Sequence, residues 1–116
     1  MKIKGFGGVF WRTNDVVSLK NWYKETLGIS MEEWNGTVIK PDAENETIFS
    51  LFQESNDYFP KEQSVMLNFQ VEEIEAWMEH FNKIGIPLLK QPEKSEFGTF
   101  IWISDPDGRW IELWEK

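Results

Sequence analysis

The sequence predicts an α+β domain built from two βαβββ modules, with halves at about 1–60 and 61–116. Each half carries one amphipathic helix that ends in Gly-Ile, at Gly28-Ile29 and at Gly85-Ile86. Short apolar runs follow both helices and predict strands. Because a helix and three strands cannot cover both sheet faces, we expect two mixed sheets that face a central groove, with the helices outside.

In the first half, Val9-Phe10-Trp11 predicts a strand, and Asn14 or Asp15 is placed to cap the helix that follows. Further strands are predicted at Trp34, 38–39 and 47–52, with a tight turn at Asn35-Gly36 and a polar loop at 41–45. The predicted buried stripe of the helix consists of Val16, Leu19, Trp22, Tyr23 and Leu27.

In the second half, residues 65–71 alternate, so that Met66, Asn68 and Gln70 share one face of a strand. Glu72 and Glu73 open a helix, and Leu88-Leu89 begins the next strand. Two more strands, 99–103 and 109–114, flank a turn at 105–108. The stripe of the second helix consists of Ile74, Trp77, Phe81 and Ile84.

A chain of 116 residues with 41% hydrophobic residues can bury a single core without disulfides. Seven Trp and nine Phe exceed what a small core needs, which favours an aromatic ligand surface or a subunit interface. The absence of cysteine excludes thiolate metal sites and cysteine nucleophiles, and it suits the reducing cytoplasm, where we expect this protein.

The net charge of -8 argues against a nucleic-acid partner, which needs a basic face. The same charge favours a cationic ligand or simply keeps the protein in solution. The N-terminal residues lack the apolar core of a signal peptide. No stretch approaches the ~20 apolar residues that cross a bilayer, so we expect no membrane association.

Two motifs resemble those of a known superfamily. Asp15 precedes a helix in which Trp22-Tyr23 is followed by Leu27-Gly28, and Asp105-Pro106-Asp107-Gly108 is followed after two residues by Ile111-Glu112-Leu113. With the order of elements between them, the chain resembles the vicinal-oxygen-chelate superfamily of glyoxalases, bleomycin-resistance proteins and dioxygenases. The resemblance implies the glyoxalase/bleomycin-resistance fold. Asp105 and Asp107 have a mechanical explanation as turn formers.

Metal-using members of this superfamily hold the metal with four groove residues, typically His, Gln or Glu. By position these correspond here to Gly8, Ser50, Met66 and Glu112, and only Glu112 is an ordinary ligand. One carboxylate does not hold a divalent ion, and we expect His80 to lie unpaired on the outside of the second helix. We therefore expect no cofactor and no metal. A register shift of one or two residues would bring in Asn68 or Gln70, and an atypical metal site would then be the alternative.

If Glu112 points into the groove, alternation along each strand predicts the residues beside it. The expected outward residues are apolar and suited to pack under the helices: Val9, Trp11, Leu67, Phe69, Ile111 and Leu113. The expected ligand-binding residues are Phe10, Arg12, Ser50, Phe52, Asn68, Gln70, Trp110 and Trp114. Glu112 is the candidate acid–base group, and Tyr58 and Phe59 are placed to cover the groove from a loop.

Three interpretations of this groove stay open. The protein binds a small aromatic or cationic molecule without chemistry, as bleomycin-resistance proteins do. Alternatively it is a lyase, isomerase or dioxygenase that uses Glu112 as acid or base, or as the ligand of an atypical metal site. In the third, Arg12 or Arg109 neutralises Glu112 and the tryptophans only fill the core. We also expect a homodimer, with the groove closed within one chain or between two.

Overall fold

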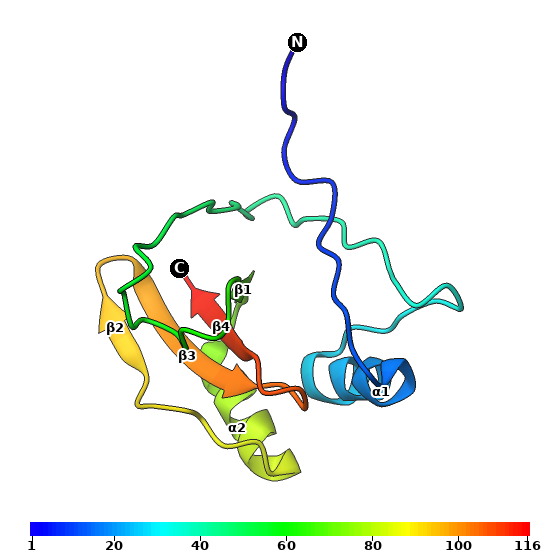
Figure 1. The fold of residues 1–116 in the computed structure, drawn as a ribbon. Coiled ribbons are helices and arrows are strands. Elements are labelled where there is room, and N and C mark those ends of the chain that lie inside the picture. Colours follow the sequence, from blue (N-terminus) through cyan, green and yellow to red (C-terminus); the bar gives the residue numbers. More distant parts are fainter.

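The computed structural model describes residues 1–116 and contains two helices and one four-stranded sheet (Figure 1). The elements are α1 (Val16–Leu27), β1 (Leu67–Gln70), α2 (Ile74–Ile84), β2 (Glu93–Ser95), β3 (Gly98–Ser104) and β4 (Trp110–Glu115). The strand order is β1-β4-β3-β2, with β1 parallel to β4 and the other pairs antiparallel. The α+β class is confirmed, and the second half forms the predicted βαβββ unit.

Both helices begin and end close to the predicted residues. Asp15 caps α1, since its carboxylate accepts a 3.0 Å hydrogen bond from the backbone N–H of Ser18, and this bond lowers the pKa of Asp15. Gly28 and Gly85 end the two helices with φ values of 69° and 79°, a left-handed conformation that glycine adopts without steric cost.

The start of α2 is held by a residue from the far end of the chain. Glu73 provides no side-chain cap there. Instead the carboxylate of Glu115, at the end of β4, accepts from the backbone N–H groups of Glu73 and Ile74 at 2.7 and 3.4 Å. This contact satisfies two free donors of the helix and fastens α2 to the sheet.

One face of the sheet forms the core with both helices. Its nine buried members come from α1, α2, β3 and β4, and they are Leu19, Tyr23, Leu27, Ile74, Phe81, Ile101, Ile103, Ile111 and Leu113. Phe69 and Trp77 pack against this cluster. His80 corrects our prediction of an unpaired residue, because its Nε2 atom lies 2.9 Å from the carbonyl oxygen of Thr26 and joins α2 to α1.

The strands predicted in the first half are the main error. Residues 1–15 and 28–66 contain no strand, so the strands expected at 9–11, 34, 38–39 and 47–52 are wrong, and no second sheet faces the first. The Asn35-Gly36 turn is confirmed, with Asn35 at φ 69° and the Glu32 N–H donating to the Gly36 carbonyl at 2.8 Å. The other segments do not form because they find no hydrogen-bonding partner strand within this chain.

Instead of pairing, the first half runs as extended chain around the sheet. After α1, the chain arcs over β1 and β4 before it enters the second half (Figure 1). Many of its apolar side chains stay exposed, among them Val38, Ile39, Ile48, Phe49 and Leu51.

A smaller correction concerns the strand predicted to begin at Leu88-Leu89. Leu89 donates one backbone hydrogen bond to Trp102, at 2.9 Å, but the chain forms no strand there. The strand is β2, four residues further on. Neither helix has the length and apolar character needed to cross a membrane.

Candidate functional site

Glu112 lies in the middle of β4, with a strand on either side. It pairs in register with Asn68 of β1 and with Trp102 of β3, so these three residues form one row across the sheet. Its neighbours Ile111 and Leu113 point into the core. Glu112 therefore points away from the helices, and yet it is only 5% exposed.

Three hydrogen bonds hold the Glu112 carboxylate. The indole N–H of Trp102 and the phenolic O–H of Tyr58 donate to Oε2 at 2.7 and 2.5 Å. The side-chain amide of Asn68 donates to Oε1 at 2.5 Å. All three donors are neutral, and Glu112 takes part in no ion pair. A buried carboxylate usually has a cationic partner, so this arrangement is a feature that needs an explanation.

Tyr58 reaches Glu112 from the chain that crosses above the sheet. Burial raises the pKa of Tyr58, and the hydrogen bond to Glu112 and its charge raise this pKa further. Tyr58 therefore keeps its proton at neutral pH and remains the donor of the pair. The sequence placed Tyr58 in a covering loop but gave no indication of this hydrogen bond, because the two residues lie 54 positions apart.

Aromatic rings surround the carboxylate. Trp102 is fully buried, and Phe100 stacks between it and Trp114, with centroid distances of 6.5 and 6.0 Å. The Tyr58 and Trp102 rings meet edge to face with centroids 6.0 Å apart, and the Phe52 centroid lies 5.6 Å from that of Tyr58. The expected aromatic cluster exists, although Trp102 and Phe100 were missing from the predicted ligand-binding residues.

A lysine lies over these rings. The Lys90 ammonium lies 4.0 Å from the centroid of the Trp102 ring and 5.1 Å from that of Tyr58. It is also 3.4 Å from the Glu93 carboxylate. Sequence reasoning missed Lys90, because a single lysine next to a predicted strand carries no signal of a contact across the sheet.

Several predicted site residues lie at or near the aromatic cluster around Glu112, which consists of Phe52, Tyr58, Phe100, Trp102 and Trp114. Asn68 binds Glu112 directly, and Phe52 joins through Tyr58. Gln70 contributes differently: its Oε1 atom accepts from the Asn45 amide and from the backbone N–H of Glu46, both at 3.0 Å. Gln70 therefore fastens the crossing chain to β1.

The first tryptophan of β4 is held through its backbone. The side-chain amide of Gln63 donates to the Trp110 carbonyl at 2.9 Å and accepts from the Trp110 N–H at 2.8 Å. The Trp110 side chain is half-buried. Trp114, at the other end of β4, donates from its indole to the Phe97 carbonyl at 2.8 Å.

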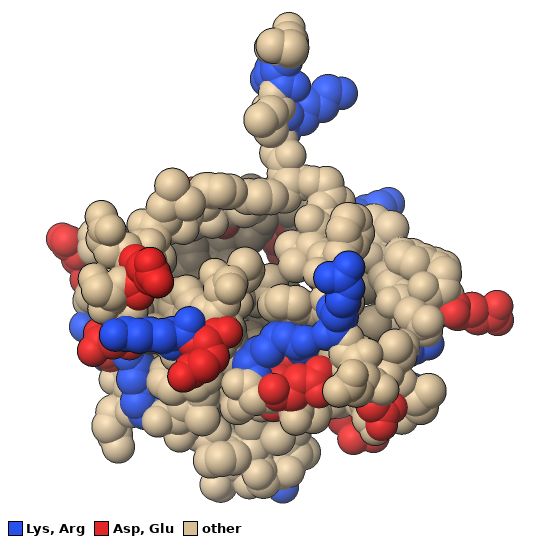
Figure 2. All heavy atoms as spheres, in the orientation of Figure 1, with Lys and Arg blue, Asp and Glu red and all other residues tan.

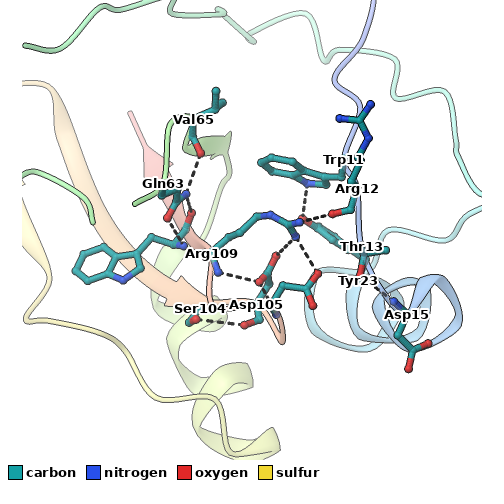
Figure 3. A network of polar contacts seen from close by, with 12 residues as sticks. Trp11, Arg12, Thr13, Asp15, Tyr23, Gln63, Val65, Ser104, Asp105 and Arg109 are labelled. Atoms are coloured by element: carbon teal, nitrogen blue, oxygen red, sulfur yellow. Dashed lines mark hydrogen bonds and ion pairs between the residues drawn. The ribbon is translucent and has the colours of Figure 1, made fainter. Parts of the chain in front are cut away.

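The remaining predicted residues lie outside the cluster. Phe10 is 94% exposed, and Arg12 and Ser50 are also exposed. The strands that would have carried these three residues inward do not form, and their place in the ligand site stays a prediction. Arg12 and Arg109 do not neutralise Glu112 either: the Arg109 guanidinium donates to the Arg12 carbonyl oxygen (Figure 3).

Arg109 belongs to a separate network around the predicted turn (Figure 3). The Asp105 carboxylate accepts from the backbone N–H groups of Asp107 and Arg109, both at 2.9 Å, and forms a 3.1 Å ion pair with Arg109. The guanidinium also lies 4.5 Å from the Trp11 ring centroid. This geometry confirms that Asp105 is a turn former.

The network also reaches α1 and the N-terminal segment. The Trp11 indole donates to the Tyr23 hydroxyl at 3.2 Å, and burial raises the pKa of Tyr23. A surface cavity of about 370 Å³ lies beside this network, between Trp11, Gln63 and Arg109. It does not include Glu112, and three of the polar side chains that line it, Gln63, Asp107 and Arg109, already form hydrogen bonds within the protein.

The face above the sheet is hollowed. Figure 2 shows a hollow between the crossing chain and the body of the molecule, with mainly uncharged residues along its rim. On this face Lys and Arg side chains lie next to Asp and Glu side chains and do not gather into one positive patch (Figure 2).

The donor set around Glu112 does not fit a divalent metal. No three His, Asp or Glu side chains lie close enough to hold an ion. Of the positions that correspond to metal ligands in relatives, Gly8 and Ser50 are exposed and Met66 has no oxygen or nitrogen donor. Both oxygens of Glu112 already accept hydrogen bonds from neutral donors.

Residues 6–116 match the family model described as "Glyoxalase-like domain". The chain belongs to this family. The superfamily resemblance seen in the two motifs is thereby confirmed, and the match includes the extended first half as well as the sheet.

Several solved structures share the fold of this chain over most of its length. A lactoylglutathione lyase from Agrobacterium tumefaciens aligns over 97% of this chain and 96% of its own, with a TM-score of 0.57 and 13% identity. A Sphaerobacter thermophilus member of the glyoxalase/bleomycin resistance protein/dioxygenase superfamily aligns over 90% of both chains, with a TM-score of 0.55 and 18% identity. TnmS3, an antibiotic binding protein from a Streptomyces species, covers 84% of this chain and 83% of its own, with a TM-score of 0.53 and 20% identity. At these identities the likeness shows the fold alone.

Proposed function

We propose that this glyoxalase-like domain binds a small organic molecule that combines an aromatic body with a cationic group, and that it holds this ligand without a metal and without chemical change. The observation that carries the proposal is the Glu112 carboxylate, which is buried among aromatic rings and has only neutral partners. A negative charge in such surroundings attracts a cation strongly, and aromatic faces favour flat, apolar partners.

A binding protein with the same fold supports this proposal. TnmS3 is an antibiotic binding protein. The net charge of -8 adds a general attraction for cationic molecules.

A calorimetric titration tests the proposal with a matched pair of compounds, 9-aminoacridine, which is cationic in slightly alkaline buffer, and acridine, which is neutral there. We expect 9-aminoacridine to bind and Glu112→Gln to weaken its binding about tenfold or more, because the variant keeps the shape of the side chain and removes its charge. Trp110→Ala should weaken both compounds through lost ring contact.

Trp34→Ala is the control for that titration, since Trp34 is 66% exposed and lies outside the cluster. Its affinity for 9-aminoacridine should equal that of the wild type. If neither compound binds the wild-type protein, or if Glu112→Gln binds both as tightly as the wild type, the proposed function is wrong.

An enzymatic role is the second candidate, and the 2.5 Å hydrogen bond between the Tyr58 hydroxyl and Glu112 favours it. Such a pair can hold or pass a proton while a substrate is rearranged. In this case, turnover in a glyoxalase or isomerase assay should vanish in Glu112→Gln. Turnover that survives this change would exclude Glu112 as the acid–base group.

We further propose that the protein forms a homodimer. The apolar residues at 38–39 and 48–52 are exposed and find no partner strand, while β1 and β2 leave the outer edges of the sheet open. Sedimentation equilibrium should give twice the 13.8 kDa of one chain, and Leu51→Glu should shift the mass toward one chain, because Leu51 is 86% exposed in the single chain. A wild-type mass of 13.8 kDa at all concentrations would contradict the dimer.

A further inference from the structure

We propose that Lys90 occupies the position of the ligand's cationic group, so that a quaternary ammonium ligand binds over Trp102 and Tyr58 by displacing the chain's own lysine. This inference deepens the proposed function and rests on it. It adds three residues, Lys90, Trp102 and Tyr58, to the binding site, and it names the chemical class of the group that they recognise.

The hydrogen bond to Glu112 makes the face of the Trp102 ring a favourable binding site for a cation. A carboxylate at the N–H edge of an indole polarises the ring, and the negative face then attracts a positive charge. In this protein Glu112 accepts from that N–H at 2.7 Å, while the Lys90 ammonium lies over the ring at 4.0 Å. The lysine thus marks where a cation is stabilised.

The position can be reached from solvent once Lys90 moves. Trp102 itself is fully buried, whereas the Lys90 side chain above it is 35% exposed. Glu93, with a side chain that is 56% exposed, already lies 3.4 Å from the ammonium. Lys90 can therefore turn away from the rings and keep its ion pair with Glu93, so that its displacement costs little free energy.

The surrounding charges favour a cation over an anion. Two carboxylates, Glu112 and Glu93, act on Tyr58, against the single positive charge of Lys90 above its ring. The N–H and O–H donors that could bind an anion, on Tyr58, Asn68 and Trp102, are already used by Glu112. If a ligand cation replaces Lys90 over the rings, it meets the negative charge of Glu112 with no lysine between them, while Lys90 stays paired with Glu93.

The ring faces also point to the kind of cation. The Lys90 ammonium contacts two aromatic faces and one exposed carboxylate. Primary ammonium groups need several hydrogen-bond acceptors, which ring faces replace poorly. Quaternary ammonium groups need none, and aromatic cages are their usual binding sites in proteins. A trimethylammonium group on an apolar body is thus the best chemical match.

Calorimetry with benzyltrimethylammonium tests the displacement, using Lys90→Met with Lys94→Met as the matched control. Both variants remove one positive charge, but the cation over the Trp102 ring is that of Lys90, whereas Lys94 lies on β2. We expect Lys90→Met to bind the probe at least about tenfold tighter than the wild type, and Lys94→Met to stay within about twofold. Lys90→Gln is the second variant, in case Lys90→Met does not fold.

A second readout needs no variant. Protons next to the Lys90 ammonium lie over the Trp102 ring, and the ring current should shift their NMR signals upfield. In the wild-type protein, saturating benzyltrimethylammonium should return these signals to ordinary lysine positions. If they stay in place while the probe binds, Lys90 is not displaced and the inference is wrong.

Phenylacetate distinguishes the opposite possibility. Binding of phenylacetate that is lost in Lys90→Met would make Lys90 an anion-binding residue, and this would overturn the inference. If benzyltrimethylammonium fails to bind while 9-aminoacridine still binds through Glu112, the inference falls and the proposed function stands. If both cations fail to bind, the proposed function falls with it.

Discussion

Replacement of Trp102 by alanine is expected to lower the free energy of unfolding by about 3–5 kcal/mol, the range typical of a large aromatic residue removed from a packed site. Trp102 is fully buried, contacts Phe100 and Tyr58, and lies under Lys90. Its loss also removes a hydrogen bond from the buried Glu112 carboxylate. Urea unfolding followed by circular dichroism measures the effect.

Trp34→Ala is the control for this experiment. Trp34 is 66% exposed, so its removal should change the free energy of unfolding by no more than about 0.5 kcal/mol. Trp102→Phe separates packing from hydrogen bonding, because phenylalanine restores most of the buried ring but cannot donate to Glu112. Equal stability of the Trp102→Ala and Trp34→Ala variants would contradict the buried position of Trp102.

Asp105→Ala should lower the free energy of unfolding by about 3 kcal/mol, the lower end of the range for breaking one partner out of a buried ion pair. The Asp105 side chain is completely buried, and it accepts two backbone hydrogen bonds in addition to the ion pair with Arg109. Removing it leaves the hairpin between β3 and β4 without its internal acceptor. Thermal and urea unfolding both report this change.

The matched control lies two residues away. The Asp107 carboxylate is also 3.1 Å from Arg109, but its side chain is 33% exposed. Because water screens an exposed pair, Asp107→Ala should cost less than about 1 kcal/mol. The two variants thus remove carboxylates at the same distance from Arg109 that differ in burial and in the two backbone hydrogen bonds that Asp105 also accepts. Similar losses of stability for both would contradict the expected difference.

The second half of the fold could be predicted from the sequence, because its signals are local. Alternation placed Asn68 and Glu112 on the face opposite to Ile111 and Leu113, and the register of β1 with β4 agrees. Gly85 ends α2 because its own backbone adopts a left-handed conformation, which glycine tolerates without steric cost. Elements of this kind depend on a few neighbouring residues.

The first half could not be predicted in the same way. Apolar runs such as 47–52 satisfy the local requirements of a strand, but a strand also needs a partner with free N–H and C=O groups. No segment of this single chain lies beside them in register. Periodicity carries no information about whether such a partner exists.

The candidate site was predicted only where it lies on the sheet. Glu112 and Asn68 follow from alternation, but Tyr58 and Lys90 do not. Both arrive from outside the strands, and their contacts depend on how far the connecting chain reaches. Glu115 lies on β4, but its contact could not be predicted either, because it caps a helix 41 and 42 positions earlier in the chain.

The paired hydrogen bonds of Gln63 constrain how the protein can change in length. Its amide binds the Trp110 backbone, and five residues earlier Tyr58 binds Glu112, two residues further along the same strand. The segment from Tyr58 to Gln63 must therefore keep a length that matches the spacing between Trp110 and Glu112 on β4. An insertion between 58 and 63 would pull one of the two contacts out of place. Residues 47–57 also run between two attachments, at Glu46 and at Tyr58, but this longer segment can accommodate an added residue without moving either contact. Insertions and deletions should therefore be tolerated better in residues 47–57 than between Tyr58 and Gln63. Tyr58 then keeps its position over Glu112 while the segment before it varies in length.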